Sequence, residues 1–224
     1  MDMESDILAY LRPDGAKGIR NHLVVVYLVE CSKHVAAEIA RRYRSRGVHL
    51  IGFSGCYPNE YSNRMLQRLC THSNVWGALL VSLGCEGFDR FSLSKAIASS
   101  GRSVKVIGVQ DTGGTMKTIE LGCAWIEDAL ERMKDNPREN MAFEELVVGT
   151  ICGGSDASSG ITANPGIGRC FDRIVESGGC AIFEETGELI GCEEIMAARA
   201  AHSELKQELL ACLDKAARFY EKLV

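Results

Sequence analysis

Six short apolar runs recur along the chain, and amphipathic stretches long enough for helices lie between them. The runs are residues 23–29, 49–53, 75–83, 104–109, 146–151 and 180–183. Strands that alternate with helices form parallel sheets, because each connection crosses one face of the sheet before the next strand begins. The sequence therefore predicts an α/β fold, with a mainly parallel, Rossmann-like sheet of about six strands and helices on both faces.

We expect these elements to form a single domain over residues 1–224. It begins with an N-terminal arm and turn (1–22), in which Pro13-Asp14-Gly15 is a turn signal, and it ends with a C-terminal helix (204–224). A chain of 224 residues with 46% hydrophobic content is long enough to bury one sizeable core.

The composition excludes several classes of protein. A net charge of −5, without a basic run or an aromatic platform, indicates no nucleic-acid partner. The chain has no apolar run of 18 residues and no apolar stretch near its N-terminus, so we expect neither a membrane span nor a signal peptide. Ten cysteines without a CxxC pair indicate a reduced, cytoplasmic protein.

Thiols, carboxylates and glycines follow the predicted strands. In parallel α/β sheets, ligands bind at the carboxyl ends of the strands. The sequence therefore predicts one cleft at this edge. Its expected lining residues are Cys56, Cys85, Gln110, Cys152, Ser155, Asp156 and Glu185.

Three uses are open for the thiols of Cys56, Cys85 and Cys152. Together they could hold iron, as a single ion or as a cluster with one open position, although their spacing matches no local metal signature. One of them could be a nucleophile, but no histidine follows a strand to act as its base. They could also be small apolar residues beside tight glycine turns.

The longest strand-to-helix connection is residues 150–165, which is rich in glycine, serine and threonine. Asn164 is expected to cap the following helix, with Pro165 at the first helical position. The Gly153-Gly154 turn here, and the Gly113-Gly114 turn before another helix, offer free N–H groups to a carboxylate, sulfate or phosphate. The alternative for residues 150–165 is a hydroxyl-rich surface loop.

Three glutamates, Glu184, Glu185 and Glu188, follow the last predicted strand. They offer a general base or hard metal ligands. The alternative is a solvated acidic turn.

Several blocks of the sequence resemble, in the same order, the altronate dehydratase and galactarate dehydratase family, which also includes a sulfolactate sulfo-lyase. They cover the chain from about residue 8 to about residue 200. The blocks are Tyr10-Leu-Arg-Pro-Asp-Gly15, Gly18-Ile-Arg-Asn21, Gly84-Cys85-Glu86, Gln110 with Gly113-Gly114-Thr115, Cys152-Gly-Gly-Ser-Asp156, Ser159-Gly-Ile-Thr-Ala-Asn-Pro165, Glu184-Glu185-Thr186 and Glu188-Leu-Ile-Gly191.

The resemblance implies a hydro-lyase that converts a sugar acid to a 2-keto-3-deoxy acid, with iron (Fe²⁺) or another divalent metal, or an iron–sulfur cluster, as cofactor. Its expected ligand is a small carboxylic acid. The expected catalytic residues are Asp156, Glu184 and Glu185, and the expected metal ligands are Cys56, Cys85 and Cys152. The expected substrate-binding residues are Arg20, Asn21, Gln110, Gly113, Gly114, Gly153, Gly154, Ser155, Ser159, Thr162 and Asn164.

The chain also departs from the family. Members usually carry an N-terminal domain with metal-binding histidines and a further C-terminal domain, and we expect both to be absent here. Ser54 stands where members tend to have a histidine. We therefore expect a homo-oligomer, or a hetero-complex with separately encoded modules, and no dehydration by the lone chain. The alternatives are a non-catalytic acid-binding or assembly subunit and a sulfo-lyase subunit.

Overall fold

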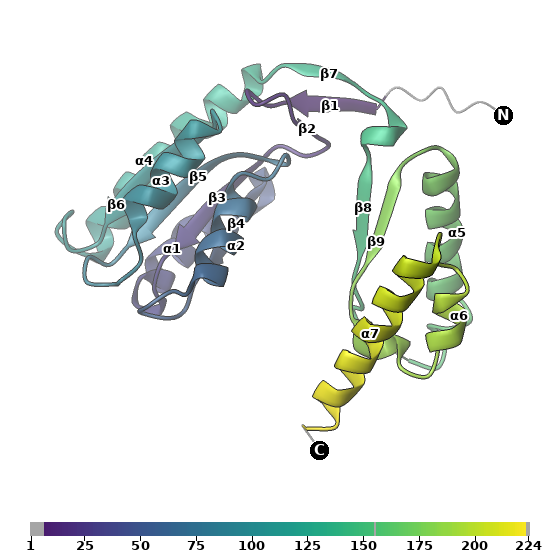
Figure 1. The fold of residues 1–224 in the computed structure, drawn as a ribbon. Helices are drawn as coiled ribbons and strands as arrows, with labels where there is room; N and C mark the ends of the chain where they lie inside the picture. Colours follow the sequence, from purple (N-terminus) through teal and green to yellow (C-terminus); the bar gives the residue numbers. More distant parts are fainter. Residues whose placement is uncertain (1–6, 155, 223–224) are drawn as a thin grey trace. The chain divides into compact units, whose positions relative to one another are not determined.

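The computed structural model describes residues 7–154 and 156–222 (Figure 1). The chain divides into two compact units, Met1–Ala142 (unit 1) and Phe143–Val224 (unit 2). The predicted α/β class and all six predicted strands are confirmed, but four strands lie in one parallel sheet and two in another. The prediction of a single six-stranded sheet is therefore wrong. We also expected a single domain, whereas the chain has two compact units.

The sheet of unit 1 has the strand order β4-β3-β5-β6, and all of its pairs are parallel. Its strands are β3 (His22–Tyr27), β4 (Val48–Gly52), β5 (Val75–Ser82) and β6 (Ser103–Gly108). Such an order arises when successive crossovers wind in two directions from the first strand. The carboxyl ends of all four strands consequently lie at one edge of the sheet.

Helices cover both faces of this sheet, as predicted. Along β3, Leu23 and Val25 pack in one buried cluster with residues of α1 and α4, whereas Val24 and Val26 pack in a second cluster with residues of α2 and α3. This alternation follows from the two-residue period of a strand. The helices are α1 (Glu30–Arg42), α2 (Glu60–Cys70), α3 (Arg90–Ser99) and α4 (Thr115–Arg132), with short 3₁₀ turns η1 (Arg44–Arg46) and η2 (Met133–Asp135).

Helices α1 and α4 approach each other closely at Gly122. A Cβ atom at this position would lie 2.4 Å from Cδ1 of Ile39, which is fully buried on α1. A side chain at Gly122 would therefore displace the buried side chain of Ile39, so glycine favours the close packing of the two helices.

The N-terminal arm forms a separate antiparallel sheet in the order β2-β1-β7, from β1 (Ile7–Leu11), β2 (Lys17–Gly18) and β7 (Arg138–Met141). The buried side chain of Arg12 fixes this arm to the amino end of the main sheet. Its guanidinium donates hydrogen bonds to Oδ1 of Asn21 (2.8 Å), the carbonyl of Ser73 (2.6 Å) and the carbonyl of Arg20 (2.9 Å). A second buried arginine, Arg102, donates to Oδ2 of Asp14 at 2.6 Å.

Unit 2 is built on a two-stranded parallel sheet of β8 (Val147–Thr150) and β9 (Cys180–Phe183). Among its described hydrophobic residues, only Ala197 and Leu213 are buried, and strand residues such as Val147 are more than half exposed. The remaining elements are η3 (Phe143–Glu145), α5 (Ala163–Glu176), η4 (Thr186–Leu189), α6 (Glu193–Ala197) and the predicted C-terminal helix α7 (Ser203–Tyr220). Within residues 7–154 and 156–222, no helix combines the length and apolarity needed to cross a membrane.

Candidate active site

The register of the β8–β9 pair brings two predicted site residues together. Thr150 is paired with Phe183 at the end of the parallel ladder, so the residues that follow these two strands leave the same edge of the sheet. Cys152 and Glu185 are each two positions beyond this last pair. The backbone N–H of Cys152 donates a hydrogen bond of 2.9 Å to Oε2 of Glu185.

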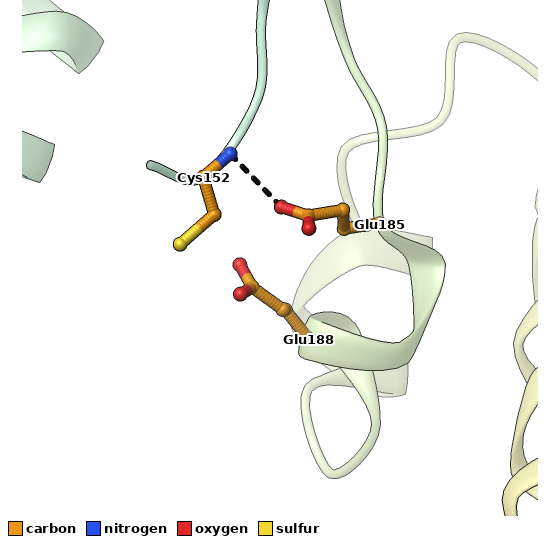
Figure 2. A group of neighbouring side chains, drawn as sticks. All are labelled: Cys152, Glu185 and Glu188. Carbon is orange, nitrogen blue, oxygen red and sulfur yellow. Dashed lines mark hydrogen bonds between the residues drawn. The ribbon is translucent and has the colours of Figure 1, made fainter. Parts of the chain in front are cut away.

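A third side chain, Glu188, joins this pair from η4. The thiol of Cys152 and one carboxylate oxygen each of Glu185 and Glu188 all lie within 4.8 Å of one another. Figure 2 shows the carboxylate of Glu188 pointing toward the thiol, with Glu185 approaching from the end of β9. All three residues are exposed, and thiolate and carboxylate groups are donors to which divalent metal ions bind.

Glu185 has a strained backbone. Its φ angle of 65° is in the left-handed region, and no other described residue except glycine has a positive φ. A left-handed conformation is unfavourable for a residue with a Cβ atom, and such strain concentrates at functional sites. The bond to Cys152 and a 2.9 Å bond from the N–H of Glu188 to the carbonyl of Glu185 support this conformation.

The cluster of Cys152, Glu185 and Glu188 opens into a cleft of about 930 Å³ that lies wholly within unit 2. This volume is suitable for a small-molecule ligand. Ile151, Phe183 and Leu189 contribute apolar walls. Further predicted site residues that line the cleft are Gly153, Gly154, Ser159, Asn164 and Glu184.

Two family models match the chain, and they divide it where the structure does. Residues 9–134, within unit 1, match the D-galactarate dehydratase/altronate hydrolase second domain. Residues 143–223, within unit 2, match the D-galactarate/altronate dehydratase C-terminal domain. The chain belongs to the galactarate and altronate dehydratase family. The resemblance expected from the sequence blocks is thereby confirmed.

Individual members of this family are similar to the chain over most of its length. Altronate dehydratase of Bacillus subtilis is 28% identical over 95% of this chain and 45% of its own length. The (2R)-sulfolactate sulfo-lyase subunit beta of Chromohalobacter salexigens is 28% identical over 93% of this chain and 54% of its own length. Galactarate dehydratase (L-threo-forming) of Escherichia coli is 31% identical over 66% of this chain and 29% of its own length.

The chain thus spans at most about half the length of these relatives. The match of residues 143–223 corrects one expectation from the sequence, namely that the family's C-terminal domain is absent. Unit 2, which contains the cleft, is the part that matches this domain.

The three-thiol metal site was predicted from strands that end at one edge of a single sheet. The strands that precede these thiols lie in two different sheets. Cys56 follows β4 and Cys85 follows β5 in unit 1, whereas Cys152 follows β8 in unit 2. In the described part of the chain, the only group of three or more potential metal ligands that lie close together is Cys152, Glu185 and Glu188. The single sheet from which one cleft lined by all three thiols was expected is wrong, because the strands form two sheets, and a site formed by the three thiols stays a prediction.

Asp156, predicted to be catalytic, is engaged in a local turn. Its Oδ1 accepts hydrogen bonds from the hydroxyl of Ser158 (2.6 Å) and from the N–H of the same residue (2.7 Å). These bonds, the hydroxyl first, hold the pKa of Asp156 below its ordinary value. A carboxylate with a lowered pKa is a weaker base, and Asp156 is not among the residues that line the cleft. The neighbouring Ser155 lies outside the described residues.

Helix α5 begins earlier than predicted. Its N-cap is Thr162, without a side-chain capping bond, so Asn164 and Pro165 are the second and third helical residues. The carbonyls of Ser158 and Ser159 already accept bonds from the N–H groups of Thr162 and Asn164. Because the chain is turning before Asn164, that residue does not have the extended backbone of an N-cap. Asn164 nevertheless lines the cleft, whereas Thr162 does not.

The remaining predicted ligand-binding residues belong to unit 1. Gln110 follows β6, and a Cβ atom at Gly84 would lie 2.7 Å from its Oε1, so the Gln110 side chain packs closely over that glycine. Gly113 and Gly114 precede α4, with Gly114 as its N-cap. These residues share the carboxyl edge of the main sheet with Cys56 and Cys85, and ligand binding there stays a prediction.

Arg20 and Asn21 precede β3, so they lie at the amino end of the main sheet rather than at its carboxyl edge. Asn21 accepts a hydrogen bond from Arg12 and donates to the carbonyl of Met133 at 3.4 Å. The amide of Asn21 therefore has a structural role. A direct contact of Arg20 with substrate stays a prediction.

Glu188 was expected, with Glu184 and Glu185, as a general base or hard metal ligand, whereas Arg199 was not among the predicted site residues. The spacing of Glu188 explains how it joins Glu185, because it lies three residues later and so returns to the same side of a helical turn. Arg199, just beyond α6, carried no signal, since a lone arginine near a helix end is usually a solvated residue.

Proposed function

We propose that the chain is a module of a metal-dependent hydro-lyase, which dehydrates a sugar acid or a related hydroxy acid to a 2-keto-3-deoxy acid. The cluster of Cys152, Glu185 and Glu188 in the unit 2 cleft carries this proposal. Family membership supports lyase chemistry, since relatives are called altronate and galactarate dehydratases.

The donor set fits a divalent first-row metal ion, with Fe²⁺ as our choice. One thiolate and two carboxylates offer soft and hard donors together, and three protein ligands leave positions open for a substrate. An iron–sulfur cluster is less well supported, because it needs several thiolates and this group has one. When bound, the metal ion would act as a Lewis acid on the oxygens of the substrate.

The side chains of the cleft are suited to an elimination. A carboxylate, for which we select Glu184, takes the proton from the carbon next to the substrate carboxylate. The electron pair of that C–H bond forms a C=C bond as the neighbouring C–O bond breaks, and the hydroxide leaves as water after it takes up a proton. The resulting enol tautomerises to the keto acid. Glu185 positions Cys152, while Ile151 and Phe183 offer apolar surface beside the cluster.

We further propose that the working form is a homo-oligomer or a complex with other family modules, in the cytoplasm. Unit 2 exposes large apolar side chains such as Ile151, Ile161 and Ile195, and burial of exposed apolar surface favours association. None of the ten cysteines, all of which lie in the described part of the chain, forms a disulfide bond, which fits a reducing compartment. The exposed cluster would leave an enediolate in water, so we expect no turnover by the lone chain.

A second candidate function is elimination of sulfite, because the similar protein of Chromohalobacter salexigens is called a (2R)-sulfolactate sulfo-lyase subunit. The same proton abstraction would then be followed by C–S cleavage. A binding or assembly subunit without catalysis is the third outcome that experiments must separate.

The metal proposal is tested by anaerobic Fe²⁺ titration. We expect about one ion per chain for wild type, and at least tenfold weaker binding for Cys152→Ser and for Glu188→Gln. Cys192→Ser is the matched control, since Cys192 is an exposed thiol of unit 2 outside the cleft lining. Equal Fe²⁺ affinity in wild type and all three variants would refute the proposed metal site.

The reaction is tested by turnover of altronate, galactarate and sulfolactate with added Fe²⁺, for the lone chain and with candidate partner chains. Formation of a keto acid with a partner supports the hydro-lyase, and sulfite release supports the second candidate. Binding without turnover in every combination would favour the non-catalytic subunit. Turnover by the lone chain would refute the need for partners.

A further inference from the structure

The cleft of unit 2 contains two arginines in different situations. Arg169 forms an ion pair with Asp172, with 3.0 Å between Nη1 and Oδ2. Arg199 also lines the cleft and is exposed, but among the described residues its guanidinium makes no ion pair or hydrogen bond. Its binding capacity is therefore available to a ligand.

Arg199 and the metal-ligating cluster come from different elements. Arg199 follows α6, whereas Cys152 follows β8 and both glutamates of the cluster follow β9. Four carboxylates line the same cleft, those of Asp172, Glu184, Glu185 and Glu188, and none of them pairs with Arg199. The cleft thus offers an unpaired guanidinium in addition to its thiol and carboxylates. A ligand with an anionic end and several hydroxyl groups would use both kinds of group.

We propose that Arg199 is the residue that binds the carboxylate of the ligand. A guanidinium presents parallel N–H donors that match a carboxylate in a bidentate pair. The choice of a sugar acid as ligand rests on the proposed function, whereas the carboxylate preference follows from the unpaired arginine. Arg199 is in this proposal a specificity-determining residue, because it selects acids over neutral polyols of the same length.

The experiment is calorimetric titration of the full chain with galactarate and with galactitol, which has the same carbon chain and no carboxylate, with and without Fe²⁺. We expect wild type to bind galactarate only. Arg199→Gln should weaken this binding about tenfold or more, since a charge-assisted pair contributes at least about one factor of ten. Arg199→Lys should retain part of the affinity, because a point charge replaces the guanidinium.

The matched control is Arg173→Gln, which removes the same charge from α5 at an exposed position outside the cleft lining. We expect galactarate affinity to change less than twofold in this variant. Circular dichroism of each variant verifies that the chain is folded.

Three results would overturn the proposal: equal losses in Arg199→Gln and Arg173→Gln, equal binding of galactitol and galactarate by wild type, or no binding of galactarate. Fe²⁺ affinity, measured separately, should be the same in Arg199→Gln as in wild type. If Cys152→Ser leaves Fe²⁺ binding intact while Arg199→Gln loses galactarate, the proposed metal-dependent function fails and the carboxylate site stands.

Discussion

The carboxylate of Glu185 accepts a 2.9 Å hydrogen bond from the backbone N–H of Cys152, and the backbone of Glu185 is itself left-handed. The residue that orients the thiol loop is thus also the strained residue of the site. Glutamate does not favour a left-handed backbone, so this conformation at the end of β9 lowers the stability of the folded chain.

The strain predicts an inverted order of stability for two substitutions. Glu185→Ala and Glu185→Gly both remove the carboxylate, but only glycine adopts a φ of 65° without a steric penalty. We expect the glycine variant to be more stable by about 1 kcal/mol, measured by urea denaturation of unit 2. At a site with negative φ, the alanine variant would be at least as stable as the glycine variant. That result would show that the backbone of Glu185 is not strained.

Cysteine reactivity should follow burial. Cys70 is fully buried, and burial raises the pKa of its thiol to about 12, so almost no thiolate forms at neutral pH. Eight cysteines, including Cys152, are exposed. We expect iodoacetamide to modify the exposed cysteines in the folded protein and to modify Cys70 only after denaturation, as measured by peptide mass spectrometry. Modification of Cys70 in native buffer would mean that unit 1 opens readily.

Acid should weaken the attachment of the N-terminal arm through Asp14. Partial burial pushes the pKa of Asp14 up, but the hydrogen bonds from Arg102 and from the N–H of Ala16, with the charge of Arg102, outweigh it and leave the pKa below its ordinary value. A lowered folded-state pKa contributes stability above the unfolded pKa, and this contribution is lost as pH falls through the folded value. The window is therefore below about pH 4.

Denaturation at neutral pH and at about pH 3 measures this effect. Asp14→Asn should cost about 1–2 kcal/mol at neutral pH, a discounted value because the Asp14 side chain is 37% exposed although that of Arg102 is 1% exposed. The variant should also lose less stability than wild type on acidification. Parallel pH profiles for the two proteins would rule out the pair as an acid-sensitive contact.

The arginine network of the arm predicts which motif residues are structural. Arg12→Lys removes most of the guanidinium bonds at a site that is 2% exposed, and we expect a loss of about 2–4 kcal/mol. Asn21→Ala should cost about 1–2 kcal/mol, and Arg20→Ala, an exposed site, less than about 0.5 kcal/mol. Thermal denaturation ranks the three, and a large loss in Arg20→Ala would contradict the network.

Most of the elements could be predicted from the sequence, because buried parallel strands are nearly continuous apolar runs and amphipathic helices have a clear period. The pairing of the strands could not. Residues 135–144 are mostly polar and lie outside the six apolar runs, yet they contain β7, whose bonds to β1 complete the sheet of the arm in unit 1. Pairing depends on contacts between residues far apart in the chain, which a local pattern does not contain.

The candidate site could be predicted only in part, because a local sequence pattern gives the ends of the strands but not their pairing. The strand-end rule selected Cys152 and Glu185, since it needs only the two strand limits. It also selected Cys56 and Cys85, which belong to the other sheet. Arg199 lies on no strand end, and its proposed role rests on the lack of an ion pair or hydrogen bond to any described residue, which only the folded chain reveals.

The buried Arg12 has a consequence for how such chains are recognised. Its hydrogen bond to the Asn21 side chain explains why Arg12 and Asn21 occur together, and both residues lie at the amino end of the sheet in unit 1. These conspicuous sequence blocks therefore report that the fold can be assembled. A homologue without the groups of the cleft would still need this bond to hold its arm, so a search profile weighted toward Arg12 and Asn21 reports the fold rather than the chemistry.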